Sequence, residues 1–253
     1  MNVAAPQEKL RLDELLVRRG LYASRSRARD AILRGTISVD GAAISKPGVL
    51  IDAACAVKSD DAAKDYVSRA ALKLVAALDH FQLSPLGKDA LDIGASTGGF
   101  TQVLLEHGAL HVIAIDVGHD QMHASLLNDS RISNLEGLNA RDLSPDHLGG
   151  RLIGFIASDV SFISLKLALP KALELAEAGA HCVLLVKPQF EAGRHAIGKG
   201  GLLKDKDLGA AIARDLSAWL NTQSGWRALG ACPSPIEGGD GNREYLLAGI
   251  KDR

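Results

Sequence analysis

The chain has 253 residues, 47% of them hydrophobic and 23% charged, with a formal net charge of −1. This composition excludes a mainly disordered chain and fits one large domain, or one α/β domain with a small companion. Cys55, Cys182 and Cys232 lie far apart without a CxxC pair, which argues against a disulfide or zinc site and favours a reducing cytoplasm. No apolar stretch approaches the length of a membrane span, and residues 1–7 lack the basic start and apolar core of an export signal, so no membrane contact is expected.

The first 60 residues carry most of the positive charge. Between Glu8 and Gly35, eight basic residues stand against four acidic ones, so this segment is net +4 and the remainder of the chain is net −5. The spacing of apolar residues predicts helices over 11–21 and 24–35. Short strands are expected over 36–41, 42–48 and 55–60, because glycine and proline turns separate these pieces.

Two arginine-rich helices followed by small strands resemble the RNA-binding fold of ribosomal protein S4, the αL motif. The residues that carry the resemblance are "RLDELLVRRG", "SRSRARDAI" and "VDG". It implies an S4-like RNA-binding domain over 9–62, whose guanidinium groups hold phosphates. An alternative, in which the arginines only solvate a helical hairpin, stays open. The residues expected to bind RNA, here and later in the chain, are Arg11, Arg25, Arg27, Arg29, Lys46, Arg69 and Arg194.

From Tyr66 on, apolar runs alternate with helical segments. Strands are predicted over 89–96, 111–118, 132–140, 154–161 and 181–188. Helices are predicted over 66–81, 164–178 and 205–221, with one more that starts at Gly98 and another that ends at Asn128. This alternation predicts right-handed crossovers and a mostly parallel, doubly wound α/β sheet. The last segments, 226–235 and 243–251, predict a hairpin that adds one antiparallel strand. The expected second domain is a Rossmann-like sheet over 63–253.

The turn after the first strand of this sheet reads "DIGASTGGFT" and contains three glycines that let the backbone approach a ligand closely. The next strand ends in Asp116, where a carboxylate can accept hydrogen bonds from ribose hydroxyls. Together these features resemble the S-adenosylmethionine site of Rossmann-like methyltransferases, while a structural turn or a dinucleotide site stays open as an alternative. The residues expected to bind this cofactor are Gly94, Ala95, Ser96, Thr97, Gly98, Gly99, Phe100, Asp116 and Val117.

Charged residues stand at the ends of three further predicted elements. The strand in "HCVLLVKPQFE" ends at Lys187, the strand before it ends near Asp159, and Glu244 opens the last strand. Taken alone, the position of Lys187 suggests a lysine at the end of a buried strand whose amine reaches solvent. With Lys73 from the helix that precedes the sheet, however, the four residues resemble the K-D-K-E tetrad of FtsJ-type ribose 2′-O-methyltransferases.

Seven separated motifs and the αL motif before them resemble the TlyA family, also labelled hemolysin A. These motifs are "VSRAALKL", "DIGASTGGFT", "DVGHDQ", "NARDL", "SDVSFISL", "LVKPQFE" and "GNREYLL". The resemblance implies methylation of cytidine 2′-hydroxyls in bacterial ribosomal RNA, with S-adenosylmethionine as cofactor, ribosomal subunits as partners and no metal. It also implies that Asp142 meets the adenine amino group, although Asp is also a common turn residue.

The chemistry suggests roles for the four charged residues. A ribose hydroxyl is a poor nucleophile at neutral pH, so the enzyme must position it and remove its proton. Burial and a neighbouring ammonium lower the pKa of a lysine, and Lys73 near Lys187 would supply the second effect. Lys187 is the expected proton acceptor, with Lys73, Asp159 and Glu244 as positioning and electrostatic partners, but base and orienting residue are not separable from sequence.

Two rival functions remain at this point. A membrane-active hemolysin is disfavoured because the sequence shows no span and no export signal. A non-catalytic RNA-binding protein of ribosome assembly would have no need for two lysines, an aspartate and a glutamate at four element ends.

Overall fold

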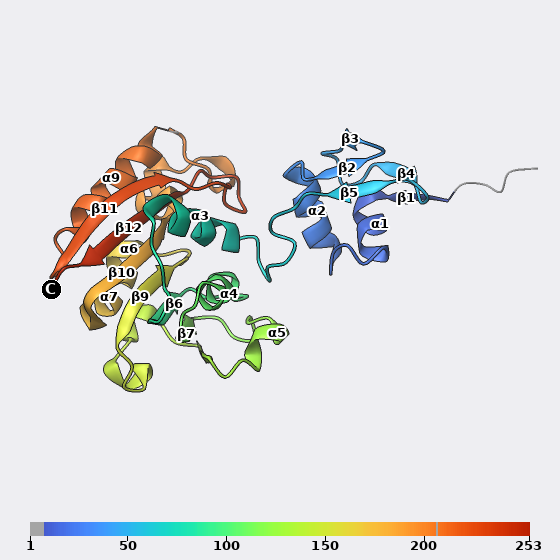
Figure 1. Cartoon of the computed structure of the whole chain (residues 1–253). Coiled ribbons are helices and arrows are strands. Elements are labelled where there is room, and N and C mark those ends of the chain that lie inside the picture. Colours follow the sequence, from blue (N-terminus) through green and yellow to red (C-terminus); the bar gives the residue numbers. More distant parts are fainter. Residues whose placement is uncertain (1–7, 206) are drawn as a thin grey trace, which may run out of the picture. The chain divides into compact units, whose positions relative to one another are not determined.

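The computed structural model describes residues 8–205 and 207–253 (Figure 1). It divides into two units, Met1–Asp65 and Tyr66–Arg253. The domain limits expected from the sequence, 9–62 and 63–253, remain a proposal.

The first unit packs two helices, α1 (Leu12–Arg18) and α2 (Arg25–Leu33), on two small sheets. Its core joins residues of both helices and the sheet, including Leu12, Leu16, Ile32 and Ile37. The side chain of Ser24 accepts a hydrogen bond from the Arg27 amide and so caps α2. The strands are β2 (Ile37–Val39), β3 (Ala42–Ala43) and β5 (Val57–Ser59) in one sheet, and β1 (Lys9–Arg11) and β4 (Leu50–Asp52) in the other.

The second unit is built on a seven-stranded sheet. In sheet order its strands are β11 (Trp226–Pro233), β12 (Tyr245–Lys251), β10 (Ala176–Val186), β9 (Ile153–Ser158), β6 (Asp89–Ile93), β7 (His111–Asp116) and β8 (Ile132–Glu136). Neighbouring strands from β10 to β8 are parallel, whereas β12 is antiparallel to both β10 and β11. The predicted parallel sheet with one antiparallel strand is therefore confirmed.

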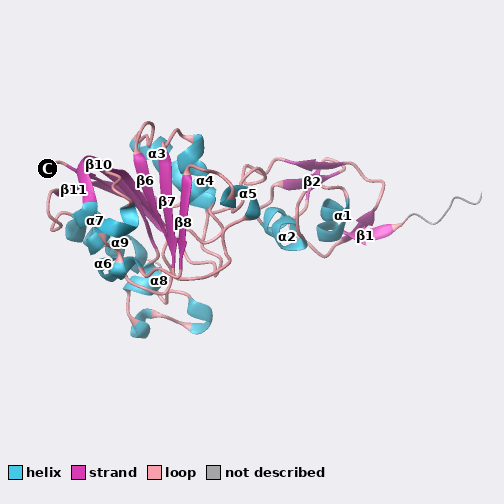
Figure 2. Cartoon of the chain, turned by 90° about the horizontal axis from the view of Figure 1, so that it is seen from below, coloured by secondary structure: helices cyan, strands magenta, loops and turns pink. Residues whose placement is uncertain are grey.

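Helices cover both faces of this sheet (Figure 2). On one face, α3 (Ala71–Phe81) and α4 (Gly99–Glu106) share a core with inward residues such as Ala90 and Val183. On the other face, α6 (Leu165–Ala168), α7 (Pro170–Leu175) and α9 (Leu208–Leu220) share a core with Leu91 and Leu184. Successive strand residues thus face opposite cores, as expected for a buried parallel sheet. The short helix α5 (Ala124–Leu127) follows β7 and precedes β8 in the chain.

Several predicted boundaries differ from the structure. The helix expected over 66–81 begins only at Ala71, and α9 begins at Leu208 rather than at 205. The helix expected over 164–178 is two short helices, because Pro170 starts a new one and β10 already begins at Ala176. A short helix, α8 (Pro188–Glu191), directly follows Lys187, which keeps the extended backbone predicted for a residue before proline. Single turns of 3-10 helix complete the unit: Ala140–Asp142, Pro145–Leu148, Arg194–Ala196 and Lys199–Gly201.

Candidate active site

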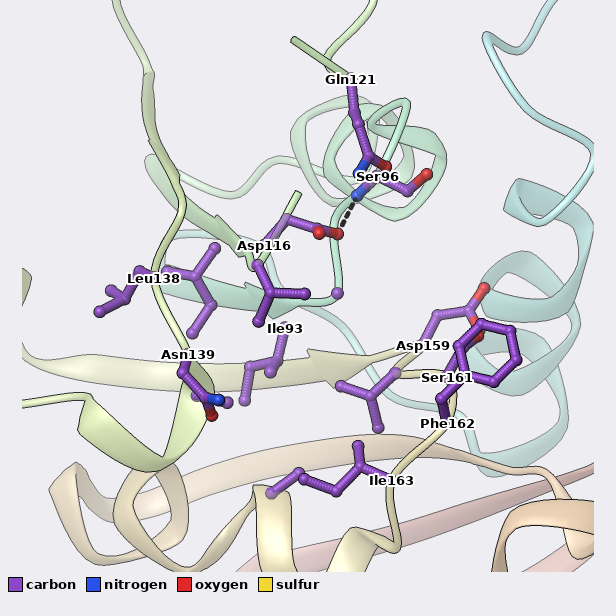
Figure 3. A pocket seen from close by; sticks show the side chains of 16 residues that line it. Ile93, Ser96, Asp116, Gln121, Leu138, Asn139, Asp159, Ser161, Phe162 and Ile163 are labelled. Carbon is purple, nitrogen blue, oxygen red and sulfur yellow. Dashed lines mark hydrogen bonds between the residues drawn. The ribbon is translucent and has the colours of Figure 1, made fainter. Parts of the chain in front are cut away.

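Two adjoining cavities open where β6, β7 and β9 end. The larger has a volume of about 480 Å³ and is lined by apolar side chains such as Leu138 and Ile163 and by the polar groups of Asp116 and Asn139 (Figure 3). The smaller has a volume of about 150 Å³, and Lys187 forms part of its wall. The residues that line both cavities are Gly94, Ser96, Asp159 and Ser161. An apolar cavity of this size with a few polar groups, at the carboxyl ends of parallel strands, is the usual form of a small-molecule site.

The glycine turn between β6 and α4 forms the shared wall of these cavities. Gly94 has a φ of +83°, and a Cβ atom there would lie 2.9 Å from the carbonyl oxygen of Asp159. Gly98 has a φ of +90°, and a Cβ atom there would lie 2.5 Å from the side chains of Met122 and Leu126. Both positions therefore require glycine for conformation and for space.

The structure brings most of the expected cofactor residues together. Ala95, Thr97, Gly99 and Phe100 line the smaller cavity, whereas Asp116 and Val117 line the larger one, together with the shared residues Gly94 and Ser96. Gly98 lines neither cavity and lies against the side chains of Met122 and Leu126. Asp142 is exposed and also lines neither cavity. Its expected contact with adenine remains a prediction, and the neighbouring Asn139 is a candidate that the sequence reasoning missed.

Asp116 links the glycine turn to the loop after β7. Its Oδ2 accepts a hydrogen bond from the Ser96 amide at 2.9 Å (Figure 3). Its Oδ1 accepts one from the Gly118 amide at 2.8 Å. A carboxylate has about four acceptor positions, so this one can still accept hydrogen bonds from a ligand in the larger cavity.

Glu136, at the end of β8, holds the same loop from its other side. Its carboxylate accepts hydrogen bonds from the backbone amides of Asp120, Gln121 and Met122. The bond from Met122 and one from the Asn134 side chain lower the pKa of Glu136 to about 2. The loop that carries Gln121 into the cavity wall is thus held by a carboxylate that is charged at neutral pH.

The four charged residues of the predicted tetrad form two ion pairs. Lys73, from α3, contacts Glu244 with an Nζ–Oε2 distance of 2.5 Å, and both side chains are almost fully buried. Lys187, after β10, contacts Asp159 with an Nζ–Oδ1 distance of 2.6 Å. Each lysine is therefore paired with a carboxylate, although only the Lys73–Glu244 contact also has the geometry of a hydrogen bond. The sequence had instead suggested an effect of one lysine on the other.

Electrostatic effects connect the two pairs. Burial raises the pKa of Glu244, while the positive charge of Lys73 opposes this shift. Asp159 and Lys187 also act on the same carboxyl, so the two pairs lie within each other's field. Beneath them, the carboxyl of Asp92 is fully buried and accepts a hydrogen bond from the Thr101 hydroxyl at 2.6 Å. Burial raises the pKa of Asp92 to about 7.

Two further residues of the site were not singled out from the sequence. The hydroxyl of Ser161 accepts a hydrogen bond from Lys187 Nζ at 2.7 Å. Phe162 lies at the rim of the larger cavity with 88% of its surface exposed and a φ of +65°. An exposed aromatic ring in left-handed backbone is unusual enough to indicate a function. Both residues belong to the quoted motif "SDVSFISL", which was the available signal.

The residues expected to bind RNA are found in different environments. Arg11 and Arg25 bond the buried carboxylate of Asp13, and Arg27 bonds the carbonyl oxygens of Ala63 and Lys64. These three arginines therefore also hold their own unit together. Arg29 and Lys46 are exposed, Arg69 is half-buried, and the side chain of Arg194 lies outside the part of the chain that is described. Their contacts with RNA remain a prediction.

Comparison with known proteins assigns a family to each unit. The model of the FtsJ-like methyltransferase family matches residues 66–251, and the model of the S4 domain matches residues 10–54. The first match spans more than half of the chain. FtsJ-like methyltransferases use S-adenosylmethionine as methyl donor.

Curated relatives and a solved structure are similar over nearly the whole chain. The 16S/23S rRNA (cytidine-2′-O)-methyltransferase TlyA of Mycobacterium tuberculosis is 43% identical, over 94% of this chain and 89% of that protein. Hemolysin A of Brachyspira hyodysenteriae is 39% identical, over 94% and 98%. A structure from Streptococcus thermophilus that carries the name hemolysin is 38% identical, with a TM-score of 0.74, over 97% and 89%. The chain therefore belongs to the TlyA family of FtsJ-like methyltransferases that carry an S4 domain.

Proposed function

We propose that this protein transfers a methyl group from S-adenosylmethionine to the 2′-hydroxyl of a cytidine in ribosomal RNA. The observation that carries the proposal is the Lys187–Asp159 ion pair, which stands where the two cavities adjoin. A proton-accepting pair beside a nucleoside-sized cavity suits a reaction that deprotonates one hydroxyl next to a bound methyl donor. The name of the Mycobacterium tuberculosis relative supports the choice of cytidine and ribosomal RNA.

The residues of the larger cavity fit the proposed cofactor. Asp116 offers free acceptor positions for ribose hydroxyls, and Leu138 and Ile163 offer apolar surface for an adenine ring. The side chain of Asn139 can bond the edge of that ring. When bound, the cofactor supplies an electrophilic methyl group, and for that reason we expect the transfer to need no metal ion.

The two ion pairs are proposed to act differently. Lys187 Nζ takes the proton from the ribose hydroxyl. Asp159 holds the amine through an ion pair of 2.6 Å and Ser161 through a hydrogen bond of 2.7 Å. An ammonium cannot accept a proton, so turnover requires the Lys187–Asp159 pair to lose one proton first. Lys73 and Glu244 provide a fixed, buried charge pair beside it.

The RNA substrate accounts for features outside the cofactor cavity. The exposed ring of Phe162 offers a surface on which an unstacked base can lie. Exposed cations such as Arg29 and Lys46 can hold phosphates. No helix among the described residues is long and apolar enough to cross a membrane. Ribosomal subunits as substrate make the cytoplasm the proposed place of action.

Methyl transfer from labelled S-adenosylmethionine to separate small and large ribosomal subunits, prepared from cells without this activity, tests the proposal. We expect label in ribose 2′-O-methylcytidine, located by mass spectrometry of RNA digests. Lys187→Met should lower turnover by at least about 100-fold, because proton transfer contributes that much in comparable enzymes. Cofactor affinity, measured by calorimetry, should remain nearly unchanged.

A matched control is Lys171→Met, which removes an exposed lysine that pairs with Glu174 on the same helix. This variant should methylate RNA at the wild-type rate. Cofactor binding by the wild-type protein without any label in either subunit would contradict the proposed function. Full turnover by Lys187→Met would contradict the role given to Lys187 but not the proposed function.

A further inference from the structure

The short helix α8, which follows Lys187 directly, contacts the segment that carries Asp159. The Oε2 atom of Glu191 accepts a hydrogen bond from the Ser164 hydroxyl at 2.6 Å, and its Oε1 atom accepts one from the Leu165 amide at 2.8 Å. These bonds cap the beginning of α6. One carboxylate thus joins the chain just after Lys187 to the chain just after Asp159.

Aromatic contact reinforces this connection. The ring of Phe190 lies 5.0 Å from the ring of Phe162, centre to centre, and the two planes are tilted by 47°. Phe162 occupies left-handed backbone, which costs on the order of 1 kcal/mol for a residue other than glycine and persists only where the surroundings enforce it. The ring of Phe190 and the carboxylate of Glu191, both from α8, provide two contacts that hold Phe162 and its neighbours in this conformation.

The same helix also contacts the loop that leads to Glu244. The Nε2 atom of Gln189 donates a hydrogen bond to Asp240 at 3.1 Å. Asp240 in turn accepts hydrogen bonds from the backbone amide and the side-chain amide of Asn242, two residues before Glu244. Four consecutive residues, Pro188–Glu191, therefore connect three of the segments that carry charged site residues.

We propose that Glu191 is a positioning residue for methyl transfer, which holds Asp159 and Ser161 in reach of Lys187. The inference rests on the proposed function and deepens it. Lys187 Nζ forms an ion pair with Asp159 at 2.6 Å and a hydrogen bond with Ser161 at 2.7 Å, so a shift of the segment by about 1 Å would weaken the first and break the second. Without the carboxylate, the segment loses two hydrogen bonds and keeps the Phe162–Phe190 contact, the hydrogen bond from the Asp159 amide to Ile93 and the packing of Val160 and Ile163 on the core. Residues 159–163 of this segment also line the larger cavity, but its Asp116 and Asn139 come from other strands and loops. Cofactor affinity should therefore fall by a smaller factor than kcat.

Glu191→Ala is the decisive variant, because alanine removes both hydrogen bonds. At saturating cofactor and RNA we expect kcat to fall about 10- to 100-fold, the range seen when reacting groups are misplaced by about 1 Å. The Kd for S-adenosylmethionine should rise by a clearly smaller factor than kcat falls, because Asp116 and Asn139 keep their places. Glu191→Gln should recover part of kcat, since its side-chain oxygen can still accept the hydrogen bond from Leu165.

Two more variants complete the experiment. Glu174→Ala removes an exposed glutamate of α7 and serves as the matched control, with unchanged kcat expected. Ser164→Ala removes the shorter bond to Glu191 and the bond that the Ser164 hydroxyl accepts from the Lys166 amide, and should lower kcat by a smaller factor than Glu191→Ala. Combined with Glu191→Ala, it should cost less than it does alone, because the shared bond is already lost. If Glu191→Ala does not fold, Ser164→Ala carries the test by itself.

The outcomes separate the two proposals. A wild-type protein that binds cofactor but methylates neither subunit counts against the proposed function. Wild-type turnover together with control-like kcat in Glu191→Ala and Ser164→Ala overturns the positioning role. A loss of cofactor affinity as large as the loss of kcat also overturns it, because Glu191 would then only support the fold.

Discussion

Replacing Lys73 with methionine should destabilise the second unit by about 3–5 kcal/mol, the cost of leaving one member of a buried ion pair without its partner. Lys73 is 5% exposed and Glu244 is 3% exposed, and their charged atoms lie 2.5 Å apart. Methionine fills nearly the same space as the lysine stem, so the expected loss comes from the unpaired carboxylate and not from a cavity.

The loss should depend on pH in a defined direction. Burial already raises the pKa of Glu244 above its ordinary value of 4.5, and removal of Lys73 takes away the largest opposing effect. An acid whose folded pKa is raised binds its proton more tightly in the folded state, so its contribution to stability is lost as pH rises through that pKa. Lys73→Met should therefore be close to wild-type stability near pH 5 and much less stable near pH 8.

Urea unfolding followed by tryptophan fluorescence measures this effect. Both tryptophans, Trp219 and Trp226, belong to the second unit, so the signal reports that unit alone. The double variant Lys73→Met with Glu244→Leu should regain most of the stability, because apolar replacement of both members of a buried pair is often neutral or favourable. It should not regain methyl transfer. A loss below about 1 kcal/mol that does not change with pH would refute the reasoning on burial, and an active double variant would show that the pair is only structural.

Three further outcomes are expected. Asp116→Asn should raise the Kd for S-adenosylmethionine about tenfold or more in calorimetry, since hydrogen bonds to a charged group contribute about 1.5–3 kcal/mol; an unchanged Kd would place the ribose elsewhere. Phe162→Gly should stabilise the unit by up to about 1 kcal/mol in urea unfolding by relieving the left-handed backbone, yet raise the KM for ribosomal subunits at least about fivefold if a base stacks on the ring. Asp92→Asn should remove a pH dependence of the free energy of unfolding, because burial raises the pKa of Asp92 from 3.8 to about 7. As pH rises from 4 to 8, the wild-type protein should lose about 4 kcal/mol of stability that the variant does not lose. A stability difference between these two proteins that is constant with pH would mean that the Asp92 carboxyl titrates normally.

The parts of the site predicted from sequence are those fixed by strand periodicity. Asp116, Asp159 and Lys187 were placed together because parallel strands end at one edge of a sheet, and the structure has them there. The alternation of strands and helices also predicted the sheet and its antiparallel β12. Pro170 offered a visible signal for the break between α6 and α7, which the sequence reasoning did not use.

Other features depend on contacts that no local pattern encodes. The partner of Lys73 lies 171 residues away, so the division of the tetrad into two ion pairs follows from tertiary packing alone. The strands β1 and β4 contain three residues each, too few for a recognisable alternation. Phe162 adopts left-handed backbone against its own preference, because contacts from α8 hold it.

The distance in sequence between Lys73 and Glu244 has a consequence for biosynthesis. A ribosome makes the lysine at the start of this unit and the glutamate only just before its last strand, and β12 must then insert between β10 and β11. During most of its synthesis the nascent unit therefore lacks the partner of Lys73 and one strand of its sheet. The first unit has no such requirement, because its core uses only its own residues, and domains generally fold in the order in which they are made. A chain that has just been made can thus hold a folded S4 domain before it has any capacity to methylate.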